Sequence, residues 1–305
     1  MPMRVSNSII TSRSQLRLQQ GLQGIDRTRD DIATGVKIRK MSDDATSAGQ
    51  IVRIGSSMRA LNQYRRNADA GMNRAQAEES ALDLLGKSLT RAIELGISQS
   101  TATANAQSRL TVKKEIDQLI NLSADLGNTR FGDEYLFGGT RAGEAPFATP
   151  APATGSFSRL VDTNNNPVNP SGNTTLEVGD GKFVTPNHNG TQVFLDTDAL
   201  DALRALSDAL GNNNPAAIKV ATDRLTAANS NVQALVGTNG ARINEMEGAK
   251  TNLDTIELNL KTYRSDLRDT NIGEAMVELS GRESLYQAAM KATTRILGLS
   301  LANYL

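Results

Sequence analysis

The sequence predicts a mainly α-helical, rod-like fold. Helices from the two chain ends pair as nested coiled coils, and a small β-rich domain is inserted in the middle of the sequence. Aromatic residues make up only 4% of the 305 residues, and tryptophan and cysteine are absent. This composition suits long helices packed side by side better than a bulky globular core. Near both termini, apolar residues recur at alternating steps of four and three, which is the heptad pattern. Most of the prolines fall between residues 143 and 196, where the helical spacing stops.

The charge and cysteine counts exclude several classes of function. Lys plus Arg and Asp plus Glu number 33 each, so no overall field favours nucleic acid or an anionic membrane, and we expect neither as a partner. The absence of cysteine removes disulfides, thiol catalysis and thiolate metal sites. No spacing typical of a catalytic, metal or cofactor site is found, so the sequence predicts a protein that is not an enzyme and uses no cofactor.

The N-terminal region predicts one long helix with a single apolar seam. From Thr11 onward the pattern advances by four and three residues, with one slot taken by Arg29. The seam consists of Leu18, Leu22, Ile25, Ile32 and Val36. The residues before it lack the apolar stretch of a secretory signal peptide, so we expect any export to follow another route.

The C-terminal region predicts one helix with two apolar seams. The first seam comprises Ile272, Met276, Leu279, Tyr286, Met290 and Leu297, and Glu283 and Thr293 take its polar slots. The second comprises Leu285, Ala289, Ala292, Ile296 and Leu299. Burying a large aliphatic side chain contributes roughly 1.5–3 kcal/mol, and one partner helix cannot cover both seams. We therefore expect neighbouring subunits, or a chaperone beforehand, to cover this helix, and another chain to contact Tyr304 and Leu305 at its end.

A short connection joins the N-terminal helix to the next one. Gly35 is placed to end the first helix, because glycine adopts a positive φ without steric cost. Asp43 and Asp44 are placed to begin the next helix, where carboxylates accept hydrogen bonds from exposed backbone N–H groups. The basic residues of the connection are expected to form ion pairs between subunits: Lys37, Arg39 and Lys40.

The chain is expected to form three domains. They are a terminal coiled coil (1–42 and 270–305), a helical rod (43–143 and 197–269) and an outward-facing β-rich insertion (144–196). In the rod, a polar hinge is expected at Ser98–Gln107, and "GNNNP" and "GTNG" are expected to separate the helices of the return side: Leu200–Leu210, Ile218–Val236 and Ile243–Leu267. In the insertion, the alternating runs "TTLEV" and "TQVFL" predict strands.

Two smaller features complete the sequence-based expectations. His188 is the only histidine, and it lies among turn-forming residues in "TPNHNGT". We expect it to be an exposed loop residue without a catalytic partner. The aromatic run from Tyr135 to Phe137 ends a helical region, and we expect it to belong to a domain core.

Four segments carry a resemblance to known proteins. They are "MRVSNSIITS" at the start, "IATGVKIRKMSDDATSAGQ", "GNTRFGDEYLFGGTRAGEAPF" from Gly127 to Phe147, and "LGLSLANYL" from Leu297 to Leu305. Together they resemble the flagellin superfamily and, within it, the hook-associated proteins of the hook–filament junction. The "DDA" stretch is shared with flagellins, whereas the "YLFGG" block and the Tyr-Leu ending look like the junction proteins.

The resemblance implies a structural adaptor of the bacterial flagellum. Such an adaptor joins the hook, through an earlier hook-associated protein, to the flagellin filament, and it assembles by coiled-coil packing of its termini. The implied partners are further copies of itself in a ring, the neighbouring hook-associated protein, flagellin, and an export chaperone on the C-terminal helix. The implied location is the extracellular flagellum, reached through the flagellar secretion channel without a cleaved signal peptide. The alternative is flagellin, the bulk filament subunit.

Overall fold

The computed structural model describes residues 2–101 and 104–302, and within these ranges the chain forms six α-helices and two short β-hairpins. In chain order the elements are α1 (Pro2–Thr34), α2 (Ala45–Gln99), α3 (Ala106–Gly127), β1 (Arg130–Phe131), β2 (Glu134–Tyr135), η1 (Gly139–Arg141), β3 (Leu176–Gly179), β4 (Lys182–Val184), η2 (Thr191–Leu195), α4 (Ala199–Gly211), α5 (Pro215–Arg268) and α6 (Ile272–Ala302). The predicted fold class, mainly helical with a small β-rich part, is confirmed.

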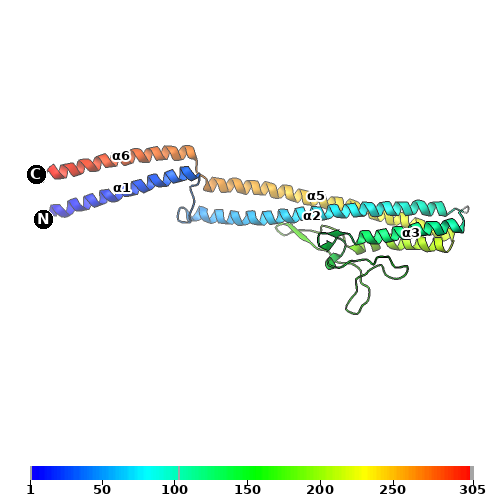
Figure 1. Ribbon diagram of the computed structural model, residues 1–305. Helices are drawn as coiled ribbons and strands as arrows, with labels where there is room; N and C mark the ends of the chain where they lie inside the picture. The colour runs from blue at the N-terminus through cyan, green and yellow to red at the C-terminus, as the bar shows by residue number, and fades with distance from the viewer. Residues whose placement is uncertain (1, 102–103, 303–305) are drawn as a thin grey trace. The chain divides into compact units, whose positions relative to one another are not determined.

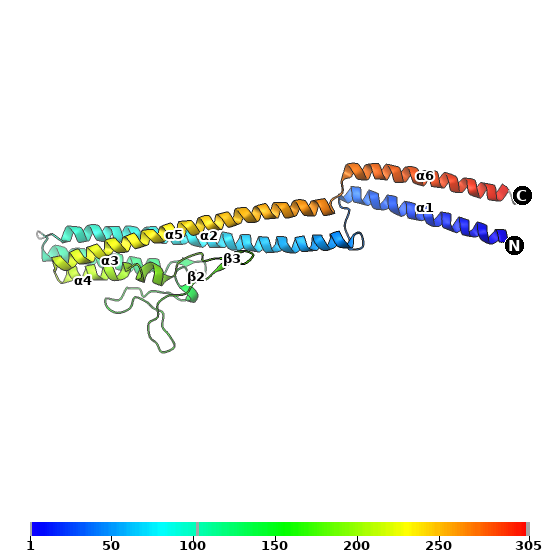
Figure 2. The same cartoon turned by 180° about the vertical axis from the view of Figure 1, so that it is seen from behind.

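The chain divides into two compact units, which we describe one at a time. The helix-pair unit comprises Met1–Arg59 and Ile256–Leu305, and the bundle unit comprises Ala60–Thr255. In the helix-pair unit, α1 and α6 lie side by side and run in opposite directions, with the N- and C-termini at the same end (Figures 1 and 2). The first and last helices of the chain are therefore paired, as the two heptad patterns predicted.

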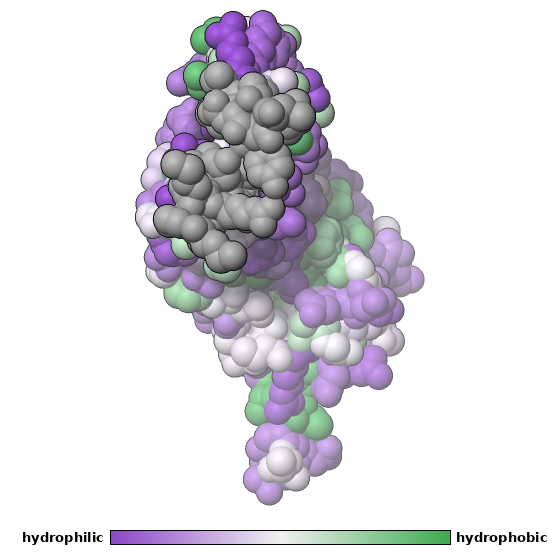
Figure 3. Space-filling model, turned by 90° about the vertical axis from the view of Figure 1, so that its left-hand side faces the viewer, coloured by the Kyte–Doolittle hydropathy of each residue, from purple (hydrophilic) through white to green (hydrophobic). Residues whose placement is uncertain are grey.

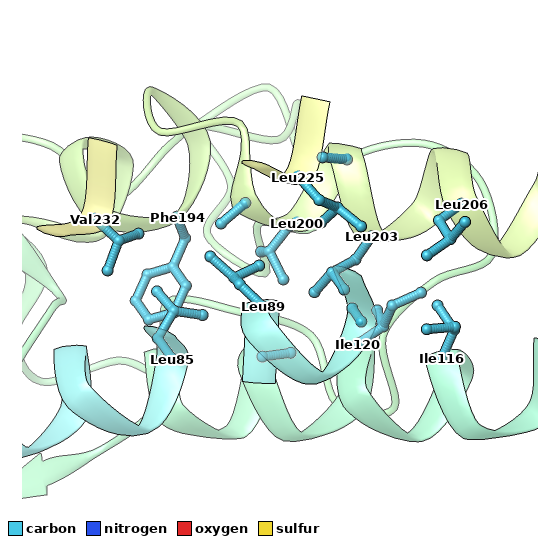
Figure 4. Packing of buried hydrophobic residues seen from close by; sticks show 14 of the residues in the cluster. Leu85, Leu89, Ile116, Ile120, Phe194, Leu200, Leu203, Leu206, Leu225 and Val232 are labelled. Atoms are coloured by element: carbon cyan, nitrogen blue, oxygen red, sulfur yellow. The ribbon is translucent and has the colours of Figure 1, made fainter. Parts of the chain in front are cut away.

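The core of the bundle unit is an apolar cluster between α2, α3, α4, α5 and the short element η2. Figure 4 shows side chains from all five elements pointing toward one another. Phe194 of η2 packs edge-on against Phe137 at 5.3 Å and against Phe147 at 5.1 Å between ring centroids. Leu136 and Phe137 are completely buried, which confirms the expectation of a core position for these two residues, whereas Tyr135 is half-buried.

The helices of the bundle unit follow the sequence pattern with one exception. The break between α2 and α3 lies where the polar hinge was predicted, and Asn105 caps α3 by accepting a hydrogen bond from the Ser108 backbone N–H at 2.8 Å. The break predicted at "GTNG" is wrong, because α5 continues through it. A Cβ atom at Gly237 or Gly240 would meet nothing within 4 Å. Each glycine costs about 1 kcal/mol in a helix, and the packed faces before and after them offset this cost.

The insertion contains one of the two predicted strands. Residues of "TTLEV" form β3, which pairs with β4 in an antiparallel hairpin. The strand predicted at "TQVFL" is wrong, because these residues form the π-helical turn η2, in which the Asp196 N–H donates to the Thr191 carbonyl at 2.8 Å. Val193 and Phe194 are both completely buried. In a strand, these adjacent side chains would point to opposite faces. In the helical turn, both point into the same core.

Much of the insertion packs into the bundle unit. Phe147 and Phe157 belong to its main core, and Val178 and Val184 pack against Ala68 and Met246 among other residues in a second apolar cluster. Residues 163–167 are exposed in a loop that a backbone bridge closes between Val161 and Pro167. Loops of the insertion project from the bundle (Figure 1), and Figure 3 shows hydrophobic residues above a hydrophilic tip in one such projection. The loop at residues 163–167 is therefore an exposed part of the insertion, whereas the four apolar residues named above are packed against the helices.

His188 differs from its prediction. Its residue exposure is 4%, and its Nδ1 lies 2.6 Å from Oε1 of Glu78, a fully buried carboxylate on α2. The His188 backbone N–H donates to the other Glu78 oxygen at 3.1 Å. The expectation of an exposed loop residue is wrong, because a buried carboxylate needs donors, and the loop supplies two of them. The signal in the sequence was Glu78 itself, which lies three residues after Ala75 and four before Leu82 on the apolar spacing of α2.

Candidate assembly interface

The connection between α1 and α2 is closed by a turn that only glycine forms easily. Gly35 follows the last residue of α1 and has a φ of +70°, which side-chain-bearing residues rarely adopt. The segment that follows Gly35 pairs with the turn between α5 and α6. The Lys37 N–H donates to the Arg268 carbonyl at 2.8 Å, and the Thr270 N–H donates to the Gly35 carbonyl at 2.9 Å. These bonds hold both inter-helix turns of the helix-pair unit together.

The adjacent aspartates have two different roles. Asp44 caps α2, since its Oδ1 accepts hydrogen bonds from the Thr46 N–H at 2.9 Å and the Ser47 N–H at 3.2 Å. The Ser47 hydroxyl bond, followed by these backbone bonds, lowers the pKa of Asp44 below its ordinary value of 3.8.

Asp43 closes the connection instead of capping a helix. Its Oδ2 accepts hydrogen bonds from the backbone N–H groups of Arg39 at 3.0 Å and Lys40 at 2.9 Å, and its Oδ1 meets the Arg27 guanidinium of α1 at 3.1 Å. The Lys40 backbone bond and then the Arg39 backbone bond lower the pKa of Asp43. The carboxylate therefore fixes the turn and ties it to α1.

The basic residues of the connection are mostly engaged within the chain. The Lys37 ammonium donates to the Asp266 carbonyl at 3.0 Å, and the Arg39 guanidinium pairs with Asp31 at 2.7 Å and Asp30 at 3.5 Å. Among the three, Lys40 is the one whose ammonium has no partner in the described part of the chain. The expected pairing between subunits therefore stays a prediction for Lys40, while Lys37 and Arg39 have partners in their own chain.

The α1–α6 contact joins the polar slots of the two predicted seams. The Arg29 guanidinium meets the Glu283 carboxylate at 2.6 Å. Glycines allow close approach nearby, since a Cβ at Gly21 would lie 3.3 Å from the Tyr286 ring and one at Gly24 would clash with the Arg282 guanidinium. The sequence pattern marked both polar slots but did not reveal that they face each other.

The pair leaves much of its apolar surface uncovered. Of the predicted seam residues with described side chains, Ile25 is buried, and Leu18, Ile32, Val36, Leu279 and Tyr286 are half-buried. The exposed ones are Leu22, Ile272, Met276, Leu285, Ala289, Met290 and Ala292, and Leu285 is 72% exposed. The side chains of Ile296, Leu297 and Leu299, and the whole of Tyr304 and Leu305, lie outside the described residues. A two-helix pair therefore covers only part of the apolar pattern.

Two hollows lie along one flank of the pair. The apolar hollow, about 270 Å³, is lined by Arg17, Leu18, Gly21, Arg282, Leu285, Tyr286 and Ala289. The acidic hollow, about 590 Å³, is lined by Thr28, Asp31, Lys37, Ser265, Asp266, Asp269, Thr270, Asn271, Glu274, Ala275 and Glu278. Arg17 and Thr28 are separated by eleven residues, as are Glu274 and Leu285. Eleven residues make three helical turns, so both hollows occupy the same flank.

The arrangement suits packing against other helices. In the described part of the chain, no group of three or more His, Asp or Glu side chains is placed to hold a metal ion. Among the described helices, none has an apolar stretch that would span a bilayer. What the helix-pair unit offers is an uncovered apolar surface with charged hollows, and such surfaces mark protein contacts.

Comparisons with known proteins point in the same direction. The family model of the bacterial flagellin N-terminal helical region matches residues 5–142, and that of the C-terminal helical region matches residues 220–305. The chain is 25% identical to a flagellin of Halalkalibacterium halodurans, over 90% of this chain and 87% of that one. It is also 25% identical to flagellar hook-associated protein 3 of Escherichia coli, over 94% of this chain and 97% of that one.

A solved structure shares the fold. The flagellar junction protein FlgL of Legionella pneumophila superimposes with a TM-score of 0.54 at 15% sequence identity, covering 70% of this chain and 98% of that one.

Proposed function

Because the chain belongs to the bacterial flagellin family, we propose that it is the adaptor subunit between the flagellar hook and the filament. It would form a ring, contact an earlier hook-associated protein on one side and receive the first flagellins on the other. Family membership implies a structural flagellar protein that assembles with other components of the extracellular flagellum. The position at the junction is our proposal.

The observation that carries the proposal is the end-to-end match to hook-associated protein 3. That match covers 94% of this chain and 97% of the relative. The "YLFGG" block supports it, because this block resembles the junction proteins and not the flagellins. A flagellin shares the same percentage identity over somewhat less of both chains, so identity alone does not separate the two functions.

The structure supports assembly by packing of the termini. The exposed seam residues of α6 would be covered when subunits meet, and each large aliphatic side chain buried would contribute roughly 1.5–3 kcal/mol. Before assembly, the same face of α6 would be held by an export chaperone. Copurification of the chain with its chaperone should be lost in a Leu285→Asp, Met290→Asp double variant and kept in a Val220→Asp variant, whose exposed side chain lies in the bundle unit.

Export would use the flagellar channel and leave the N-terminus intact. N-terminal sequencing of the protein detached from purified flagella should begin at Met1 or, after methionine removal, at Pro2. A start further along the chain would contradict this route.

The position in the flagellum is tested by labelling intact flagella. An epitope inserted after Asn165, in the exposed loop, should bind antibody-gold in a narrow band where hook meets filament. Label along the whole filament would instead make the protein a flagellin. An untagged strain controls for background, and motility of the tagged strain shows that the insertion is tolerated.

A further inference from the structure

The two hollows on the flank of the helix pair differ in charge. In the acidic hollow, the carboxylates of Asp266 and Glu274 have no cationic partner within the described part of the chain. Lys37 is the one cation that lines this hollow, and its ammonium donates to the Asp266 carbonyl. Five carboxylates face this single positive charge, and only two of them have an arginine partner in the described chain: Asp31 and Glu278, the other three being Asp266, Asp269 and Glu274. The hollow therefore presents unneutralised negative charge to whatever covers it.

In the half of the helix pair that lies nearest the chain termini, every charged side chain is positive. No acidic residue precedes Asp26 in the sequence, and none follows Glu283. The described cations of this half are exposed and have no carboxylate partner in the described chain: Arg13, Arg17, Lys291 and Arg295. Arg17 also borders the apolar hollow, and Arg13 lies one turn before it on the same face of α1.

This charge pattern distinguishes two ways of packing copies of the chain. Side-by-side copies in register would bring cationic halves together and acidic hollows together, which is unfavourable within the screening length of about 8–10 Å. A shift of about 15 residues along the helix, or about 22 Å, would bring the arginines of one copy to the acidic hollow of the next. Like-charge rejection and opposite-charge attraction commonly fix the register of helical contacts.

We propose that this flank is the contact between neighbouring copies of the chain, and that the copies are staggered. Arg13 and Arg17 of one copy lie in the acidic hollow of the next, beside Asp266 and Glu274. The same neighbouring helix covers Leu285 at the apolar hollow. Two different patches meet in this contact, so it is heterologous, and because both patches lie on one flank it propagates along the helix axis into a staggered row. The inference rests on the proposed function, which requires copies to pack through their termini, and adds the surface and the register.

Cysteine cross-linking tests the register directly, because the chain has no cysteine of its own. An Arg17→Cys chain and a Glu274→Cys chain are mixed as concentrated full-length proteins and oxidised. The staggered contact predicts a disulfide-linked heterodimer at least fivefold more abundant than either homodimer. Ser280→Cys is the matched control, since Ser280 is also exposed on α6 but lies about 120° around it from Glu274. It should give little product with Arg17→Cys.

Three results would overturn the proposal. Dominant Arg17→Cys homodimers would indicate packing in register, and equal yields with Glu274→Cys and Ser280→Cys would indicate random collision. Absence of any cross-link would likewise rule out this contact.

Charge reversal provides a second, independent test. Arg17→Glu should weaken association of the full chain about tenfold by sedimentation velocity, and combining it with Glu274→Arg in the same chain should restore association to within threefold of wild type. A double variant as weak as the single one would contradict the pairing. These measurements use purified chain, whereas the junction position is read from labelled flagella. Failure of the stagger is therefore distinguishable from failure of the proposed function.

Discussion

The bundle unit and the helix-pair unit use the same heptad-like spacing with different results. In the bundle unit, Leu203, Leu206 and Leu210 of α4 are completely buried among helices on several sides. In α1 and α6, Ile25 and Ala275 are the apolar residues that are buried among the described side chains, while Leu285 is 72% exposed. The spacing shows that a face is apolar, but the number of neighbouring helices decides whether it is covered.

This difference in the burial of apolar faces predicts which unit is stable without other copies of the chain. The bundle unit buries its apolar faces within one chain, and its aromatic rings lock the insertion to the helices. An isolated helix pair has little to offset the conformational entropy of ordering two long helices. The helix-pair unit therefore gains much of its stability from assembly, whereas the bundle unit is already stable in the monomer.

Truncating a core leucine of the bundle unit is the largest expected effect. Leu203→Ala should lower the free energy of unfolding by about 2–5 kcal/mol, because it removes buried methyl groups and leaves a cavity. Urea unfolding of the full chain followed by circular dichroism measures this. A loss under 1 kcal/mol would break the comparison, since it would mean that this core is not the main source of stability.

Removing the buried carboxylate should have the next largest effect. Glu78→Ala leaves the His188 N–H and its ring without their acceptor in a buried site, which should cost about 1–3 kcal/mol. Glu78→Gln retains an acceptor oxygen and should cost less. The same urea titration compares the two variants, and equal losses would mean that the hydrogen bonds of this pair contribute little.

The connection of the helix-pair unit should loosen in acid. The pKa values of Asp43 and Asp44 are lowered in the folded chain by backbone and side-chain hydrogen bonds. The stability that these carboxylates provide is therefore present above their ordinary pKa of 3.8 and is lost as the pH falls through the lowered values.

Amide chemical shifts of Thr46 and Ser47, which donate to Asp44, report this loss between pH 5 and pH 2. In Asp44→Asn the cap is kept but does not titrate. Its shifts should stay nearly constant over this range, and a wild-type-like titration in this variant would assign the change to another group.

Truncating a leucine of the helix-pair unit should have the smallest effect on the monomer. Leu285→Ala removes the same atoms as Leu203→Ala, but from a side chain that is 72% exposed. The free energy of unfolding should change by about 0.5 kcal/mol or less, while self-association should weaken measurably in sedimentation velocity. A destabilisation comparable with that of Leu203→Ala would show that the pair is already packed in the monomer.

The sequence predicted helices well where the periodicity was long. Both terminal helices, the hinge after α2 and the core position of Phe137 follow from spacing and composition. The failures occur where tertiary packing decided the outcome. Gly237 and Gly240 are helix breakers in isolation, but packed turns on both sides carry α5 through them. Phe194 alternates like a strand residue, yet the core required it and Val193 on one side.

The candidate interface was predicted in part. Spacing identified the apolar seams and their polar slots, and turn chemistry identified Gly35 and Asp44. Spacing could not show that Arg29 faces Glu283 or that Arg39 is held by Asp31, because these contacts join helices whose relative rotation the sequence does not state. His188 was misplaced for a similar reason, since its partner lies 110 residues away on α2.

The exposed loop of the insertion is closed at its base by a backbone bridge between Val161 and Pro167 and by a hydrogen bond from the Asp162 N–H to the Asn166 carbonyl at 2.8 Å. The short stretch of chain between these residues leaves and returns at nearly one point, and doubling the length of such a loop adds only about 0.6 kcal/mol of closure entropy. Foreign peptides placed near Asn165 would therefore leave the helices undisturbed. The protein offers a natural display scaffold, on which antigens or fluorophores can be presented at the cell surface.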